Sequence, residues 1–134
     1  MSEPTFVVAA VCLRDASGLM LAVRKRGTSA FMLPGGKIEA GETPLQCALR
    51  ELHEEVGLEL ASAEPLGHFL DDAANEPGHL VDATVFAADL APNAPLPAPI
   101  AEIDELRWLD PAALPVDVPL APVLVRVAAQ VIAG

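Results

Sequence analysis

Short hydrophobic runs separated by turn-forming residues dominate the chain, and this pattern predicts a protein built mainly on strands. Residues 6–15 (FVVAAVCLRD) and 19–26 (LMLAVRKR) are apolar and rich in β-branched side chains, and Gly18 lies between them. They are predicted to form neighbouring strands joined by a tight turn. Three later runs of similar character are also predicted as strands: 64–72, 79–90 and 103–110.

Two segments instead repeat apolar side chains every three or four residues, as helices do. The first has an N-cap at Thr43 that begins a Thr-x-x-Gln capping box, and Gly57 is expected to end it in the left-handed conformation. The second begins at Pro119, and its apolar positions are Leu120, Val123, Leu124, Val127 and Val131. Strands, a helix, further strands and a terminal helix predict an α/β or α+β sandwich.

The segments between these elements contain no internal repeat and no domain boundary. Residues 29–36 (SAFMLPGG) are predicted as a short extended segment that ends in proline and glycine. Residues 91–101 hold four prolines in eleven positions, which is typical of a stiff connector. We therefore expect residues 1–134 to form a single domain.

Composition and charge exclude several classes of function. Although 52% of the residues are hydrophobic, no run reaches the roughly 18 to 20 apolar residues of a membrane helix, so no membrane partner is expected. The net charge of −11 argues against a nucleic-acid polymer as partner, because binding one needs a basic surface. The two cysteines, Cys12 and Cys47, make no disulfide framework, which favours a reducing, cytoplasmic location.

Three acidic residues crowd the first predicted helix. At about 100° per residue, Glu51, Glu54 and Glu55 fall between about 180° and 280° from the apolar stripe, on one flank away from the core. Such a flank is either a solvated outer face or the place of a cation. The glycine-rich loop before the helix can bring a backbone carbonyl to the same place, and hard oxygen ligands suit Mg²⁺ or Mn²⁺. The residues alone leave both explanations open.

Residues 36–58 (GKIEAGETPLQCALRELHEEVGL) resemble the Nudix box: glycine, five residues, glutamate, seven residues, then Arg-Glu-aliphatic-x-Glu-Glu-x-Gly-aliphatic. The residues that meet its specified positions are Gly36, Glu42, Arg50, Glu51, Leu52, Glu54, Glu55, Gly57 and Leu58. The resemblance implies an α/β/α sandwich around a central mixed β-sheet, with the box as a loop–helix–loop and a C-terminal helix. It also implies Mg²⁺- or Mn²⁺-dependent hydrolysis of a nucleoside diphosphate linked to another moiety.

The same resemblance implies roles for single residues. Glu51 and Glu55 are expected to be the main metal ligands, and Glu54 is expected to bind the metal directly or through water. The backbone carbonyl of Gly35 is expected as a further ligand. The residues expected to support the box, among them a buried ion pair that orients it, are Gly36, Glu42, Arg50 and Gly57.

Hydrolysis of a phosphoanhydride also needs a carboxylate that takes a proton from the attacking water. The resemblance leaves two sources for this base: the box glutamate Glu51, or an acid outside the box. Glu54 is also counted among the catalytic candidates. Our candidate outside the box is Glu102, for which an ordinary surface position is the alternative. Glu105 and Asp82 compete for the same role.

The substrate is less well defined by the sequence than the box. Arg24, Lys25 and Arg26 lie where some relatives hold substrate phosphates, although a solvated strand end explains them equally well. We expect a small-molecule nucleotide or nucleoside diphosphate derivative as partner, acted on by a monomer or homodimer. The first hypothesis is a nucleoside triphosphate pyrophosphohydrolase of the nucleotide-sanitising type. The alternatives are a pyrophosphatase of ADP-ribose, nucleotide sugars or dinucleotides, and a non-catalytic nucleotide-binding module.

Overall fold

The computed structural model describes residues 4–133, which form one sheet of six strands and two helices. The elements in chain order are β1 (Thr5–Arg14), β2 (Met20–Lys25), β3 (Gly35–Lys37), α1 (Pro44–Val56), β4 (Glu64–Asp72), β5 (Leu80–Asp89), β6 (Ile103–Leu109) and α2 (Pro122–Ala133). The strands predicted from the hydrophobic runs are all present. The proline-rich connector between β5 and β6 is irregular, as expected.

The sheet is mixed, with strand order β4-β5-β1-β2-β6. The central pair, β1 and β5, runs parallel, whereas the other pairs are antiparallel. On the side of β1 away from β5, two partners share the strand: β3 pairs with Val8 to Ala10, and β2 joins only at Arg14. The short β3, which carries the first residues of the box, is therefore held against the middle of the sheet.

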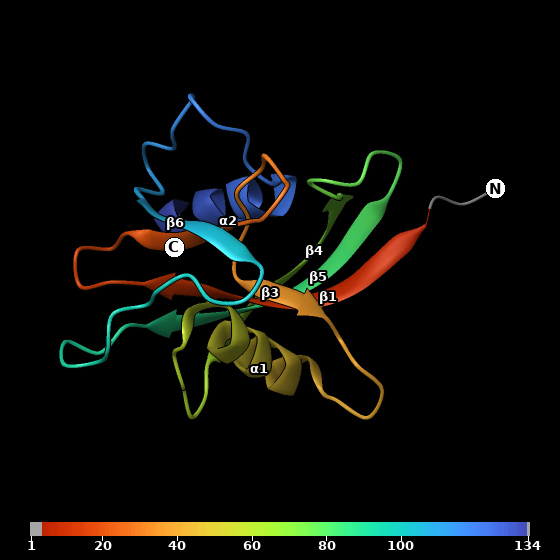
Figure 1. The fold of residues 1–134 in the computed structure, drawn as a ribbon. Helices are drawn as coiled ribbons and strands as arrows, with labels where there is room; N and C mark the ends of the chain where they lie inside the picture. The colour runs from red at the N-terminus through yellow and green to blue at the C-terminus, as the bar shows by residue number, and fades with distance from the viewer. Residues whose placement is uncertain (1–3, 134) are drawn as a thin grey trace.

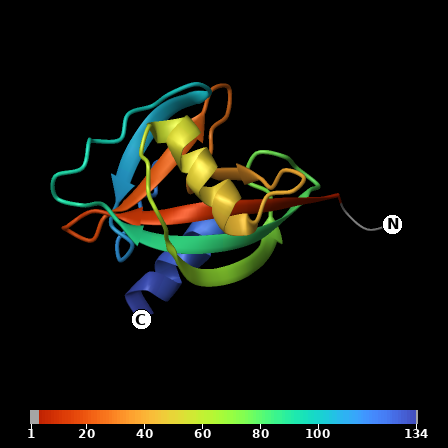
Figure 2. The ribbon, with the colours of Figure 1, turned by 90° about the horizontal axis from the view of Figure 1, so that it is seen from below.

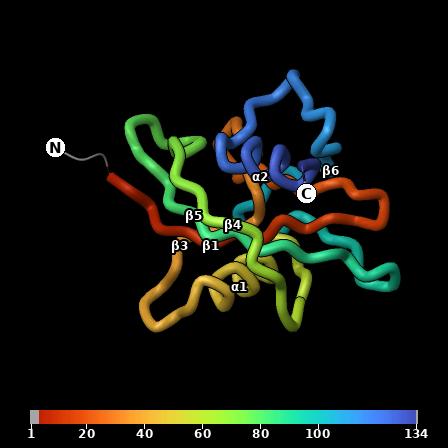
Figure 3. The backbone as a smooth tube through the Cα atoms, turned by 180° about the vertical axis from the view of Figure 1, so that it is seen from behind, coloured from red at the N-terminus to blue at the C-terminus, as the bar shows by residue number. Residues whose placement is uncertain are grey.

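The two helices cover opposite faces of the sheet, α1 on one side and α2 on the other (Figures 1 and 2). The same three layers are seen from behind in Figure 3. Alternation along β1 explains the layers, because Ala9, Val11 and Leu13 belong to the core under α1, while Ala10 and Cys12 belong to the core under α2. Both faces are buried, which is why the strand reads as a continuous apolar run. The expected α/β/α sandwich is confirmed.

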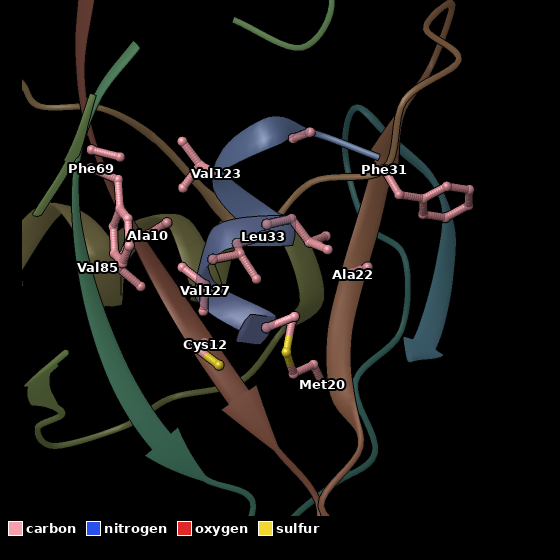
Figure 4. Packing of buried hydrophobic residues seen from close by; sticks show 14 of the residues in the cluster. Ala10, Cys12, Met20, Ala22, Phe31, Leu33, Phe69, Val85, Val123 and Val127 are labelled. Atoms are coloured by element: carbon pink, nitrogen blue, oxygen red, sulfur yellow. The ribbon is translucent and has the colours of Figure 1, made fainter. Parts of the chain in front are cut away.

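In the core on the α2 side, residues of β1, β2, β4 and β5 pack against the last helix (Figure 4). Val123 and Val127 of α2 lie over β1 and β5, and Leu124 is fully buried among them. The helix begins at Pro122 rather than at the predicted Pro119. The reason is pairing: Leu120 forms a bridge with Phe31, so these residues stay extended.

Helix α1 begins and ends where the sequence indicated. Thr43 accepts a hydrogen bond from the backbone of Gln46 at 3.1 Å, and the Gln46 side chain accepts one from the backbone of Thr43 at 2.9 Å. Gly57 has φ of 79° and donates its N–H to the carbonyl of His53 at 2.9 Å.

Within residues 4–133, neither helix combines the length and apolar character needed to cross a membrane.

The packing of α2 predicts a large difference between two adjacent residues. Replacing the buried Leu124 by alanine should lower the free energy of unfolding by about 2–5 kcal/mol, because it leaves a cavity between helix and sheet. The control is Val125→Ala, at a position 43% exposed, which should change it by no more than about 0.5 kcal/mol. Urea unfolding followed by Trp108 fluorescence measures both. Equal decreases in the free energy of unfolding for the two variants would contradict this placement of α2.

Candidate functional site

Two glycines let β3 lie unusually close to its neighbours. A Cβ atom added at Gly35 would lie 2.4 Å from the carbonyl oxygen of Ala9 on β1. One added at Gly36 would lie 2.5 Å from the carboxyl carbon of Glu51 on α1. Real Cβ atoms do not approach so closely, so these positions need glycine for packing rather than for unusual backbone angles. The carboxylate of Glu51 thus lies directly on the backbone of β3.

The three helix glutamates differ in burial, which corrects the prediction that all of them lie on a flank away from the core. Glu55 is buried at 2% exposure, whereas the Glu51 and Glu54 side chains are 14% and 53% exposed. Exposure increases with angular distance from the apolar stripe, because β3 and its loop cover the edge of the helix next to that stripe. The wheel showed the direction of each side chain but not what lies over it.

Glu55 sits at the base of the site with incomplete hydrogen bonding. Its Oε1 accepts a hydrogen bond from the N–H of Gly35 at 3.1 Å, while its Oε2 is buried and has no partner among the described residues. Burial first, and then the neighbouring Glu51 carboxylate, raise the pKa of Glu55 to about 8, although the nearby Lys25 lowers it in part. An anion here lacks enough compensating charge from the protein itself.

Arg50 connects the box loop to the helix, as the resemblance implied. Its Nε and Nη2 donate to the two carboxylate oxygens of Glu42 at 2.6 and 2.9 Å, a bidentate pair. Its Nη1 donates to Glu51 at 2.8 Å and to Glu54 at 3.2 Å. The pKa of Glu42 is lowered to about 2, mainly by the hydrogen bonds from Arg50 and also by the backbone N–H of Glu39. One guanidinium therefore holds three carboxylates in place.

The residues of this site suit a hard divalent cation. Glu51 and Glu55 offer carboxylate oxygens, one of them buried and unpaired, and Glu54 stands at the exposed rim. Within residues 4–133, however, no three His, Cys, Asp or Glu side chains are already gathered at metal-binding distance. Arg50 contacts two of the glutamates instead. The contact observed at Gly35 is through its N–H, so a role for its carbonyl stays a prediction.

A cavity of about 170 Å³ opens beside β3. Its apolar wall includes Leu33, from the segment before β3, and Val123 and Leu124 of α2. Gly35 and Gly36 line it next to the carboxylates. Its other polar or charged lining residues are Lys25, Thr28, Lys37, Asp72, Asn75 and Glu76.

Of the three basic residues proposed for phosphate, the structure brings only Lys25 to the cavity. Arg24 donates to Asp104, at 2.9 Å, and to Glu105 on the neighbouring β6. Arg26 donates to the carbonyl of Ala101 at 3.1 Å. The adjacent positions of a strand alternate between faces, so a basic run cannot direct all of its side chains to one ligand.

The acids considered outside the box lie in different surroundings. Glu102 is 3.5 Å from the ammonium group of Lys25, which places it next to the cavity although its side chain is 59% exposed. Glu105 is paired with Arg24, and Asp82 contacts His68 on β4. Of these three acids, Glu102 is therefore the one that contacts a residue lining the cavity, Lys25.

Lys37 and Asn75 are among the lining residues that the sequence analysis did not select as candidates. Lys37 follows the first box glycine directly, and its ammonium lies 4.3 Å from the ring centre of Phe6. The Phe6 ring in turn stacks on His79, with centroids 5.1 Å apart. Asn75 comes from the loop between β4 and β5. The adjacency of Lys37 to the box was a usable signal, whereas nothing local distinguished Asn75.

The lowered pKa of Glu42 predicts a pH-dependent stability difference. The folded-state pKa of about 2 lies below the unfolded value near 4.5, so the ionised carboxylate stabilises the fold above about pH 4.5 and loses this effect as the pH falls toward 2. Glu42→Gln should therefore lower stability at about pH 7, and the difference from wild type should shrink between about pH 5 and pH 3. Urea titrations across this range measure it.

The matched control is Glu39→Gln, since that side chain is 70% exposed and its nearest carboxylate oxygen is 3.7 Å from Arg50. It should leave the pH profile close to that of wild type. A Glu42→Gln difference that stays constant with pH would contradict the role of the ion pair.

Comparison with known proteins gives a consistent result. A family model described as the NUDIX domain matches residues 4–131. The chain is 36% identical over 96 residues to a Danio rerio protein named oxidized purine nucleoside triphosphate hydrolase, covering 69% of this chain and 58% of that protein. It is 42% identical over 57 residues to an RNA pyrophosphohydrolase of Halorhodospira halophila, covering 42% of this chain and 32% of that protein. The chain thus spans about a third to three fifths of these relatives.

A solved structure shares the fold along nearly its whole length. The crystal structure of a MutT NUDIX hydrolase from Burkholderia pseudomallei superposes with a TM-score of 0.78. The match covers 96% of this chain and 98% of that one, at 23% sequence identity. The arrangement of sheet and helices is therefore preserved where most side chains differ.

Proposed function

The chain belongs to the NUDIX family, and on that premise we propose that it is a divalent-metal-dependent hydrolase of nucleoside triphosphates. It cleaves a phosphoanhydride bond and releases a nucleoside monophosphate and pyrophosphate. The observation that carries the proposal is the buried, unpaired carboxylate oxygen of Glu55 beside Glu51, next to a cavity lined by Lys25 and Lys37. Acidic and basic groups meet there as a metal-bound phosphate would require.

Glu51 and Glu55 would hold the Mg²⁺ or Mn²⁺, with Glu54 at the rim. Such an ion would neutralise charge on the phosphate oxygens and make an attacking water more acidic. The Glu42–Arg50 pair fixes the box loop against the helix, so its role is to position the carboxylates. Because the carboxylates rest on the backbone of β3, their oxygens are held before the substrate binds.

Two carboxylates are the candidates for accepting the proton of the attacking water. Glu51 belongs to the box itself, and Glu102 stands beside Lys25 near the cavity. We assign Lys25 and Lys37 to the phosphate chain, since both line the cavity, Lys25 lies close enough to Glu55 to lower its pKa, and Lys37 directly follows Gly36. Ammonium groups there would offset the negative charge that gathers during hydrolysis.

The choice of a nucleoside triphosphate rests on the cavity and on the relatives. A volume of about 170 Å³ suits one ring system rather than two nucleoside units. The protein from Danio rerio is named for oxidized purine nucleoside triphosphates, and its similarity extends over 69% of this chain. The net charge of −11 disfavours a long nucleic-acid substrate. The second relative is named an RNA pyrophosphohydrolase, so an RNA with a 5′-triphosphate is included in the test.

A substrate screen tests this proposal. With Mg²⁺ present, the protein should release pyrophosphate from nucleoside triphosphates, faster than it cleaves ADP-ribose, a dinucleoside polyphosphate or a 5′-triphosphate RNA. Fastest turnover of ADP-ribose or a dinucleotide would transfer the assignment to that substrate class. Absence of turnover on every substrate would leave a non-catalytic nucleotide-binding module.

Glu51→Gln should lower kcat by roughly 10²- to 10⁴-fold on the best substrate, because it removes a metal ligand or base. The measurements are pyrophosphate release, Mn²⁺ binding by electron paramagnetic resonance, and urea unfolding to confirm the fold. The control is Glu64→Gln, an exposed acid on β4, which should behave as wild type. Normal turnover by the Glu51 variant would show that the site lies elsewhere.

Gly36→Ala tests the packing that holds Glu51. The added Cβ would overlap the Glu51 carboxylate, which can swing away at small cost to stability, so we expect a folded protein with Mn²⁺ affinity and kcat each reduced about tenfold or more. The control is Gly41→Ala in the same loop. Its φ of 80° makes alanine costly by about 1 kcal/mol, but its Cβ meets no atom within 4 Å. Gly41→Ala should thus lose stability and keep activity; the reverse pattern would contradict this account.

A further inference from the structure

The end of the proline-rich connector is hydrogen-bonded to the end of α1. The N–H of Ala98 donates to the carbonyl of Val56 at 3.1 Å, and the N–H of Ile100 donates to the carbonyl of Glu55 at 3.0 Å. The last carbonyls of a helix have no partner within the helix, so the connector satisfies two of them. Residues 97 and 99 are prolines, which have no N–H to donate. Both backbone donors that residues 97–100 possess are therefore used on α1.

Ala101, the last residue of the connector, has a backbone conformation that L-residues avoid. Within residues 4–133 it is the one residue other than glycine with positive φ, at 55°. This conformation is unfavourable for alanine, because the Cβ atom comes too close to a backbone carbonyl oxygen. Strained residues of this kind persist only where the neighbouring structure imposes the conformation, and they cluster at functional sites.

Hydrogen bonds hold the chain on both sides of Ala101. On one side, the N–H of Ile100 is bound to Glu55, whose side chain is the buried carboxylate of the site. On the other side, the backbone N–H of Arg26 donates to the carbonyl of Glu102 at 2.7 Å. The Arg26 side chain adds a second bond, from Nη2 to the carbonyl of Ala101 at 3.1 Å. The turn is thus held between α1 and the segment that follows β2.

Glu102 comes directly after this turn. Its carboxylate is 3.5 Å from Nζ of Lys25, which lines the cavity. An extended conformation at position 101 would change φ by roughly 180° and would redirect the chain that follows. The left-handed turn at Ala101 therefore decides where the Glu102 carboxylate lies.

We propose that Ala101 and Arg26 are positioning residues, which hold the Glu102 carboxylate beside Lys25 so that it accepts the proton of the attacking water. This inference rests on the proposed function, in which Glu102 is one of two candidates for that role. Arg26 then acts through Glu102, in contrast to the phosphate-binding role expected from the sequence. A general base must lie within hydrogen-bond reach of the proton it takes, so displacing its carboxylate lowers the rate and not the affinity for substrate.

Arg26→Ala should lower kcat for the best nucleoside triphosphate about tenfold and leave KM within about twofold of wild type, because it removes a bond to Ala101 and no contact with substrate. Arg26→Lys can still donate to that carbonyl and should restore most of the rate. The control is Arg126→Ala. Arg126 also donates from its guanidinium to a backbone carbonyl, that of Leu70 at 3.0 Å, and its loss should leave kcat and KM unchanged.

A double variant tests whether Arg26 acts through Glu102. Glu102→Gln alone should lower kcat roughly 10²-fold or more, as expected for a lost general base. If Arg26 only positions Glu102, adding Arg26→Ala to Glu102→Gln should lower kcat by less than about twofold further. Mn²⁺ binding, measured by electron paramagnetic resonance, should be the same for Arg26→Ala as for wild type. This measurement separates a displaced Glu102 from damage to the box carboxylates.

Two substitutions of Ala101 test the turn itself. A β-branched residue at positive φ is strongly disfavoured, so Ala101→Val should leave this conformation and lose about tenfold in kcat with KM unchanged. Glycine adopts positive φ readily, so Ala101→Gly should keep kcat within about twofold of wild type. Urea unfolding shows whether both variants are folded, and the Arg26 variants carry the test if Ala101→Val is not.

The possible outcomes separate this inference from the proposed function. Normal turnover by Glu102→Gln or by Arg26→Ala overturns the inference and leaves the proposed function standing. A raised KM at unchanged kcat in Arg26→Ala does the same, because it assigns Arg26 to the phosphates. Equal kcat for the folded Ala101→Gly and Ala101→Val variants, full additivity in the double variant, or weaker Mn²⁺ binding by Arg26→Ala also overturns it. Absence of hydrolysis by the wild-type protein on every triphosphate removes the proposed function, and the inference with it.

Discussion

The close approach of β3 to β1 and α1 is the constraint on which the site depends. It requires that positions 35 and 36 carry no side chain, because a Cβ at either would lie within 2.4 to 2.5 Å of atoms of Ala9 or Glu51. With glycine there, the N–H of Gly35 reaches the Glu55 carboxylate and the Glu51 carboxylate rests on the strand. A flank of α1 that an isolated helix would expose to water thus becomes one wall of a site.

This packing concentrates negative charge that the protein compensates only in part. Arg50 satisfies Glu42 with two hydrogen bonds and reaches Glu51 and Glu54 with its remaining amino group. Glu55 receives one backbone N–H and distant help from Lys25, and burial still raises its pKa to about 8. The compensation is therefore unequal: Arg50 pairs with Glu42 and also contacts Glu51, while Oε2 of Glu55 is buried and has no partner among the described residues.

Local signals predicted the local features well. The capping box at Thr43, the left-handed Gly57 and the apolar runs of the strands depend on residues next to one another in the sequence, and each has the predicted form. The Glu42–Arg50 pair joins residues eight positions apart, and the box motif implied it before the structure showed it. These interactions are encoded within one segment, so no knowledge of the rest of the fold is needed.

The sequence by itself determined the family, the α/β/α layers and the identity of the box residues, because periodicity and motif spacing are properties of the chain alone. Only the tertiary structure decided which of those residues are buried, since the cover over Glu55 comes from β3 and not from its own helix. It also decided that Lys25 lines the cavity while Arg24 pairs with β6, and that Asn75 reaches that cavity. Burial and unpaired polar atoms arise where segments distant in the sequence come together, so patterns among neighbouring residues cannot predict which residues they affect.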